Sequence, residues 1–136
     1  MKTKIISVIV LSAAFALTGC GGSQSDPIKT AEQFTQAWYN LNYDTCNDLS
    51  KREEFVYEKD MGSIEKKFMK EMQKEAKKMK YVVKVNKEDT RISDDGEDAR
   101  IELIITGKDD FEYEGTVRVE KGEDGKWRVY DYYLKN

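Results

Sequence analysis

Histidine is absent from this chain of 136 residues. Its absence excludes catalytic triads and dyads that use imidazole as the base, and the common zinc sites that use histidine ligands. Cysteine is scarce as well: Cys20 and Cys46 are the only two, too few for a cage of thiolate ligands. The sequence therefore predicts neither a metal site nor a bound cofactor.

An excess of positive charge is missing too. The chain has 23 lysines and arginines against 26 aspartates and glutamates, which gives a formal net charge of −3. A protein that binds nucleic acid needs a basic surface that displaces counterions from the phosphates. We therefore expect no nucleic-acid partner.

The one long apolar run stands at the amino terminus. Lys2 and Lys4 precede an apolar and small-residue run over residues 5–17, which has the length of a signal-peptide core and is too short to span a bilayer comfortably. The run ends in Leu-Thr-Gly-Cys at residues 17–20, which resembles the lipobox of bacterial lipoproteins. In such proteins a peptidase cuts before the cysteine after its thiol has been diacylated. The alternative is an ordinary secretory signal with a chance cysteine.

The lipobox resemblance implies an anchor and a compartment. Residues 1–19 would be removed as a lipoprotein signal peptide, and a covalent lipid on Cys20 would attach the chain to the membrane of a bacterial cell envelope. Loss of Lys2 and Lys4 lowers the formal net charge from −3 to −5. Gly21 follows the cysteine in place of the aspartate that often marks inner-membrane retention. This favours the outer membrane, facing the periplasm, if the cell is Gram-negative. Residues 20–26 are expected to form the lipidated cysteine and a flexible polar tether.

Helical spacing dominates the first half of the remaining chain. Asp26 and Pro27 are typical of a helix start, as N-cap and first helical residue, and apolar residues at helical spacing predict a helix over 27–41. A second, short helix is predicted after the break at 42–44, running through Cys46 and Leu49. A third begins at Ser63.

The third predicted helix has two faces. At 100° per residue its apolar side chains fall in one broad arc: Met61, Ile64, Phe68, Met69, Met72, Ala76 and Met79. We expect this stripe to pack on the sheet as a lid. Lysines fall on the opposite side, among them Lys66, Lys70, Lys74 and Lys78 at i, i+4 spacing. These lysines face water, or alternatively they face phospholipid headgroups or a partner.

From residue 81 the period changes to two, which indicates strands. We expect one strand over 81–92 with a bulge near 86–88, and three more over 99–105, 111–119 and 126–134. Acidic and glycine-containing turns separate them, and these are more typical of hairpin tips than of calcium loops. The expected fold class is therefore α+β, with about three N-terminal helices packed on a curved four-stranded antiparallel meander.

Three segments resemble the nuclear transport factor 2-like superfamily, whose cone-shaped fold is also described as cystatin-like. Residues 27–50 resemble its opening helices, 94–107 its hairpin strands, and 123–134 its final Gly-Lys-Trp strand. The resemblance implies a single domain over 27–136 and is closest to small bacterial lipoproteins of unknown function. Enzymes of the superfamily use Asp, His or Tyr inside the cone, and this chain has no His.

Aromatic residues provide candidate walls for a pocket inside the cone. The candidate pocket residues are Phe34, Trp38, Tyr39, Tyr113, Trp127 and Asp131. The alternative is that the rings fill the core. Asp131 stands among tyrosines, as an isomerase-like site with a carboxylate base would need. The favoured hypothesis is a non-enzymatic domain that binds a small apolar ligand or an envelope protein. The alternatives are an isomerase-like enzyme and a structural envelope component.

Cys46 is left without a partner if Cys20 carries a lipid. The favoured interpretation is a small buried apolar residue, and the alternative is a reactive thiol or a disulfide with another chain.

Overall fold

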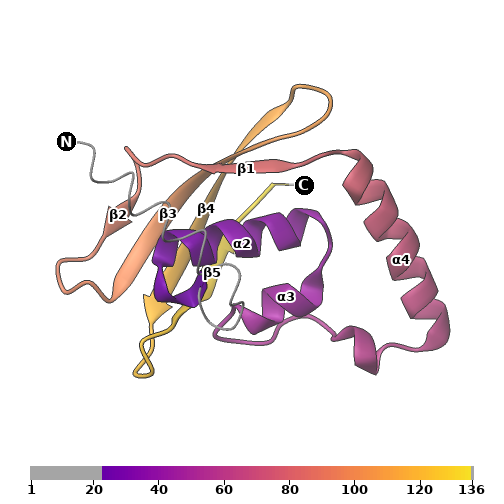
Figure 1. Cartoon of the computed structure of the whole chain (residues 1–136), viewed down its shortest axis with the longest axis horizontal. Helices are drawn as coiled ribbons and strands as arrows, with labels where there is room; N and C mark the ends of the chain where they lie inside the picture. Colours follow the sequence, from indigo (N-terminus) through magenta and orange to yellow (C-terminus); the bar gives the residue numbers. More distant parts are fainter. Residues whose placement is uncertain (1–22, 136) are drawn as a thin grey trace.

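The computed structural model describes residues 23–135, so the predicted signal peptide and Cys20 lie outside the described residues (Figure 1). The helical elements are η1 (Ser23–Ser25), α2 (Pro27–Tyr39), α3 (Tyr43–Asp48), η2 (Glu58–Asp60) and α4 (Ser63–Lys78). The strands are β1 (Val82–Val85), β2 (Arg91–Ile92), β3 (Asp98–Thr106), β4 (Glu112–Lys121) and β5 (Trp127–Tyr133). Helices followed by an antiparallel sheet confirm the α+β class.

The sheet has the order β1-β3-β4-β5, and the short β2 pairs with β3 beyond the end of β1. The predicted single strand over 81–92 was wrong, because β1 and β2 are separate and the sheet has five strands in place of four. The β2–β3, β3–β4 and β4–β5 connections are hairpins at the predicted turns. Gly96 and Gly125 sit at two of these tips with φ of 73° and 82°, a backbone region that favours glycine.

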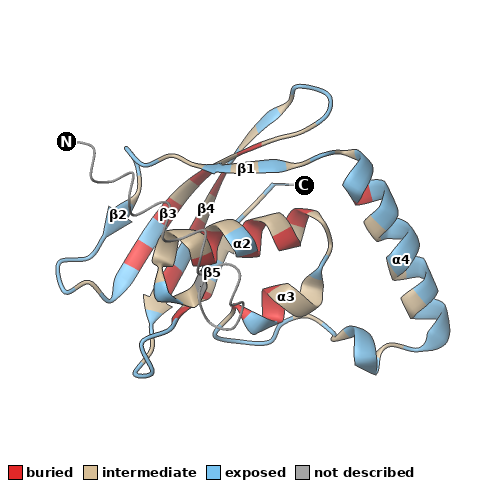
Figure 2. Ribbon diagram, viewed as in Figure 1, coloured by how far each residue is buried: buried red, intermediate tan, exposed pale blue. Residues whose placement is uncertain are grey.

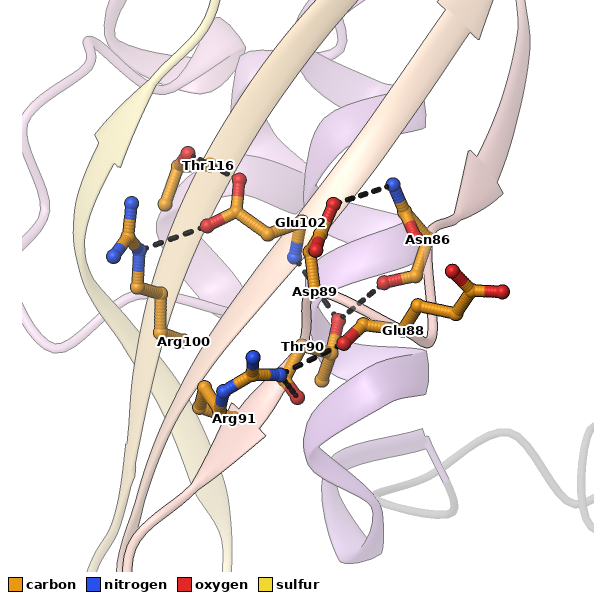
Figure 3. Close-up of polar contacts among 8 residues, drawn as sticks. All are labelled: Asn86, Glu88, Asp89, Thr90, Arg91, Arg100, Glu102 and Thr116. Carbon is orange, nitrogen blue, oxygen red and sulfur yellow. Dashed lines mark hydrogen bonds and ion pairs between the residues drawn. The ribbon is translucent and has the colours of Figure 1, made fainter.

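The interruption between β1 and β2 is a polar loop that closes on itself (Figure 3). Asn86 Nδ2 donates to Asp89 Oδ2 at 3.0 Å, and the Thr90 hydroxyl donates to the Asn86 carbonyl at 3.0 Å. The same Thr90 hydroxyl accepts from the Glu102 backbone N–H at 3.1 Å. A side chain thus satisfies a backbone donor of β3 that a continuous strand would otherwise have bonded.

Helix α2 packs across the sheet and forms the core with it. Alternate residues of β3 and β4 point at α2, as their period of two predicted. Figure 2 shows these buried positions as red bands on α2, β3 and β4. The buried apolar cluster is Ala31, Phe34, Ala37, Tyr39, Cys46, Leu49, Ala99, Ile101, Leu103, Ile105, Val117, Val119, Trp127 and Val129. Each fully buried large aliphatic side chain contributes about 1.5–3 kcal/mol relative to exposure.

The ends of α2 follow from local sequence. The Asp26 carboxylate accepts from the Ile28 N–H at 2.8 Å, and Pro27 occupies the first turn, as predicted. The helix ends at Tyr39 and not at Leu41, because Leu41 adopts a left-handed φ of 61°. The Asn42 N–H then bonds the Ala37 carbonyl at 2.8 Å, and the Leu41 N–H bonds that of Trp38 at 3.2 Å. This pair of bonds closes the helix end in a Schellman motif.

Helix α4 does not cover the sheet, and the predicted lid was wrong. It lies beside the rest of the domain, at the right in Figure 1, and Ala76 is its one buried residue. Ile64 is 84% exposed and Phe68 is 66% exposed. The physical reason is that α2 already occupies the apolar face of the sheet. Periodicity identifies which residues share a helix face, but it does not identify the surface that the face meets.

Two hydrogen bonds attach α4 to the domain. The Gln73 amide donates to the Leu41 carbonyl at 2.9 Å, and the Lys108 backbone N–H donates to the Met79 carbonyl at 2.7 Å. The first bond joins the middle of α4 to the turn after α2, and the second joins its C-terminal end to the β3–β4 hairpin. These contacts fix one edge of α4 and leave the part of its apolar face that carries Ile64 and Phe68 uncovered.

The described part of the expected tether is held against the domain. Residues Ser23–Ser25 form η1, and the Gln24 amide donates to the Trp127 carbonyl at 3.1 Å. This bond ties the segment before α2 to the start of β5.

Candidate functional site

A groove of about 440 Å³ lies between α4 and the C-terminal end of α2. Its walls come from the two helices and from the segments that follow each of them. The lining residues are Trp38, Tyr39, Leu41, Tyr43, Met72, Glu75, Ala76, Met79 and Tyr81. The volume lies within the range of pockets that hold small organic molecules.

The groove is apolar in character. Of the nine lining residues within the described range 23–135, eight are aromatic or aliphatic and one, Glu75, is charged. The Glu75 side chain is 69% exposed, and its Oε2 pairs with the Lys78 ammonium at 2.9 Å. The carboxylate is therefore neutralised at the surface, and the arrangement suits an uncharged, apolar or aromatic occupant.

One wall is a chain of packed rings. The Trp38 and Tyr39 ring centroids lie 4.9 Å apart, edge to face, and those of Tyr39 and Tyr81 lie 5.0 Å apart. The Tyr39 hydroxyl donates to the Lys135 carbonyl. Burial is the main cause that raises the pKa of Tyr39 to about 12, so this phenol stays neutral at physiological pH. The wall is therefore uncharged.

Tyr43 forms the opposite corner and is supported from behind. Its ring stacks on Phe55 with centroids 4.4 Å apart and parallel planes. Asn47 is only 2% exposed, and its side chain bonds both backbone polar groups of Phe55. Its Nδ2 donates to the Phe55 carbonyl at 2.8 Å, and its Oδ1 accepts from the Phe55 N–H at 3.0 Å. Asn47 thus positions Tyr43 through Phe55 without touching the groove.

The structure brings together two of the six predicted pocket residues. Trp38 and Tyr39 line the groove. Phe34 and Trp127 are 0% and 5% exposed and belong to the core. Tyr113 is half-buried beside Phe111, with ring centroids 4.7 Å apart, and does not line the groove.

Asp131 lies on β5, away from the groove lining. Its side chain is exposed, and its Oδ1 accepts from the backbone N–H of Tyr132 at 3.0 Å. The structure therefore does not place this carboxylate beside Trp38 and Tyr39.

Sequence reasoning missed most of the groove-lining residues. Met72, Ala76 and Met79 were recognised as one face of α4, but that face was assigned to the sheet. Leu41 and Tyr81 stand at the ends of predicted elements, where a pattern gives no direction for the side chain. The sequence did contain one signal. It predicts two long helices with apolar faces, and α2 alone covers the apolar face of the sheet, so the apolar face of α4 needs another partner.

The four selected lysines lie along α4. Lys74 pairs with Glu71 at 3.5 Å, and Lys78 pairs with Glu75 at 2.9 Å. Lys70 is exposed and Lys66 is half-buried, and neither forms an ion pair with any residue from 23 to 135.

Cys46 is fully buried in the core, which confirms the interpretation as a small apolar residue. Its thiol points to the Phe34 carbonyl, with Sγ 3.8 Å from the oxygen. Burial raises the pKa of this thiol to about 12. The thiolate that would react is therefore essentially absent at neutral pH.

Over residues 23–135, no cluster of three or more cysteine, aspartate and glutamate side chains is arranged to hold a metal ion. Within the same residues, no helix is both long enough and apolar enough to cross a membrane.

Comparisons with protein-family models, with curated proteins and with solved structures found no match to this chain.

Replacement of Asn47 tests the support behind Tyr43. We expect Asn47→Asp to lower the free energy of unfolding by about 3 kcal/mol at neutral pH, because a buried carboxylate would face the Phe55 carbonyl without a donor. Burial raises the pKa of the introduced carboxyl group in the folded state, so the deficit shrinks as the pH falls through that raised pKa. Urea unfolding followed by tryptophan fluorescence at neutral and mildly acidic pH measures both effects.

Asn42→Asp is the matched control. Asn42 is exposed and caps α3 by accepting from the Thr45 N–H, a role that a carboxylate also fills. Its stability should stay within about 0.5 kcal/mol of the unaltered protein. Equal stability of the two variants would contradict the assigned role of Asn47.

Proposed function

We propose that this chain is a lipid-anchored protein of the bacterial cell envelope whose single domain binds a small apolar molecule without chemically altering it. The observation that carries the proposal is the groove between α4 and α2, with eight aromatic or aliphatic residues and one ion-paired carboxylate in its lining. Such a lining gains free energy by releasing water from an apolar occupant, at about 25 cal/mol per Å² removed from solvent.

Binding fits this groove better than catalysis does. An isomerase-like reaction needs a carboxylate base beside the substrate together with groups that stabilise an enolate. Glu75 is the one carboxylate in the lining, and its negative charge is directed to Lys78 at the surface. Asp131, the base that the sequence offered, lies elsewhere on β5.

The resemblance to the nuclear transport factor 2-like superfamily supports the same proposal. The described order of helices followed by an antiparallel sheet is the order expected of that superfamily. The proposed branch is that of the small bacterial lipoproteins of unknown function, and the role of a binding module is proposed for the domain of this chain.

The lipobox at residues 17–20 supports the proposed location. Acylation of Cys20 would attach the chain three residues before Ser23, the first residue of η1. The domain would then lie at the surface of the membrane that holds the lipid. If the cell is Gram-negative, this is the periplasmic face of the outer membrane.

Filling the groove tests ligand binding. The uncharged fluorophore N-phenyl-1-naphthylamine serves as the probe, and its fluorescence should rise on binding to the unaltered domain. Ala76 is 8% exposed and lines the groove, so Ala76→Trp should weaken probe binding at least tenfold by occupying the space. Met72→Asp, at a residue 38% exposed, should weaken it similarly by placing a charge in the lining.

Lys70→Trp is the control, because it adds the same ring to an exposed position on the lysine side of α4. Its probe affinity should match that of the unaltered domain, and urea unfolding should show all variants folded. Unchanged affinity in both groove variants, or equal loss in the control, would reject the groove as the binding site.

Acylation has its own test. Cells that express the full chain with a tagged C-terminus and receive radiolabelled palmitate should incorporate label into this protein, and the protein should fractionate with membranes. Cys20→Ser should abolish incorporation of the label, whereas Cys46→Ser should keep both the label and the membrane fractionation because Cys46 is buried in the fold. Label retained in the Cys20→Ser protein would refute the anchor.

A further inference from the structure

The apolar face of α4 extends beyond the groove as an uncovered stripe. Met72 lines the groove, and Phe68 and Ile64 continue the same line at i, i+4 spacing toward the start of the helix. Exposure rises along it, from 38% at Met72 to 66% at Phe68 and 84% at Ile64. Exposed apolar residues in a continuous line indicate a surface that meets something other than water.

The charge of α4 is opposite to that of the rest of the chain. Its sixteen residues contain six lysines and three glutamates, in a chain whose formal net charge is −3. Glu71 and Glu75, at the border of the apolar stripe, are neutralised by Lys74 and Lys78. The other lysines of the helix have no acidic partner among residues 23–135: Lys66, Lys67, Lys70 and Lys77. Their charge is therefore available to an external anion.

We propose that α4 docks on the surface of an anionic phospholipid bilayer. A helix with a lysine-rich face, a low mean hydropathy and an apolar face that carries Phe and Ile is typical of helices that lie in the membrane interface. Ile64, Phe68 and Met72 enter the headgroup region. A helix is about 10 Å across, so the lysines stay within about one Debye length of the lipid phosphates, and their flexible stems bring them closer.

The geometry of the chain agrees with two attachments to one surface. The described residues begin at Ser23, three residues after Cys20, and three residues span at most about 10 Å when fully extended. The segment η1 contacts α2, and α4 bonds Leu41 just beyond the other end of α2. Since α2 has 13 residues, η1 and the point where α4 is bonded lie about 20 Å apart. This step alone rests on the proposed acylation of Cys20.

A bilayer explains the stripe better than a second copy of the chain does. Three side chains in one line expose well under the roughly 800 Å² per partner that a stable protein interface buries. A symmetric pairing of two α4 helices would also bring two lysine-rich segments together, whereas an anionic bilayer attracts each lysine separately.

Vesicle cosedimentation tests the proposal without the lipid anchor. Residues 20–136 with Cys20→Ser contain every described helix and strand and the whole core cluster, so this chain retains the fold. It should bind vesicles of equal parts phosphatidylglycerol and phosphatidylcholine at about 10 mM salt, and bind several-fold more weakly at about 150 mM salt. Pure phosphatidylcholine vesicles should bind it at least tenfold more weakly.

Paired variants separate the two contributions. Ile64→Gln with Phe68→Gln should weaken binding at least tenfold, and Lys67→Gln with Lys70→Gln should weaken it about fivefold per lysine. The controls are Ile92→Gln, at an isoleucine 52% exposed on β2, and Lys121→Gln with Lys126→Gln, at exposed lysines outside α4. These controls should bind like the unaltered chain.

Three results would overturn the proposal. The first is absence of binding to anionic vesicles at low salt, and the second is an equal loss of binding in the controls. The third is that the chain does not bind vesicles but forms a concentration-dependent dimer, and that Phe68→Gln abolishes this dimer. Such a result would assign the stripe to a protein interface. Probe binding in the groove is measured without vesicles, so failure of docking and failure of ligand binding are distinguishable.

Discussion

Helix α2 presses Ala31, Phe34 and Ala37 onto the apolar face of the sheet, and the alternate residues of β3 and β4 receive them. This contact lies at the centre of the buried apolar cluster of the described residues, and burial of apolar surface is the dominant favourable term in folding. Helix α2 thus occupies the apolar face of the sheet, and α4 lies elsewhere. The position of α4, the groove and the exposed stripe all follow from that occupancy.

Because α4 is excluded from the sheet, it meets the domain along one edge. Gln73 and Met79 provide the polar attachments, to the turn after α2 and to the β3–β4 hairpin. The residues of its apolar face nearest α2 close over Trp38 and Tyr39 and make the groove. Those farther along the helix, Ile64 and Phe68, have no covering partner among the described residues. One amphipathic helix therefore serves both the proposed ligand site and the proposed membrane contact.

The parts of the fold that depend on local sequence were predictable. Asp26 and Pro27 define the start of α2, and alternation over 99–105 and 111–119 defines which residues of β3 and β4 are buried. The loop between β1 and β2 was not predictable, because a polar run is compatible with either a bulge or a loop. The hydrogen bond from the Glu102 N–H to the Thr90 hydroxyl, which accompanies the loop, is not visible in the sequence. The site was predicted only in Trp38 and Tyr39. Whether a ring fills the core or lines a groove depends on which surfaces are already covered, and no local pattern contains that information.

Helix α4 is fastened at one edge while α2 and the sheet form the core, and hydrogen–deuterium exchange can measure this difference in local stability. The amides of α4 should exchange through a local opening whose free energy lies well below that of global unfolding, while amides of α2, β3 and β4 exchange only near the global value. Urea dependence of the exchange rates distinguishes the two, because a local opening exposes little surface and responds weakly to urea. Amides of α4 that exchange at the global free energy, together with those of α2, would contradict the account.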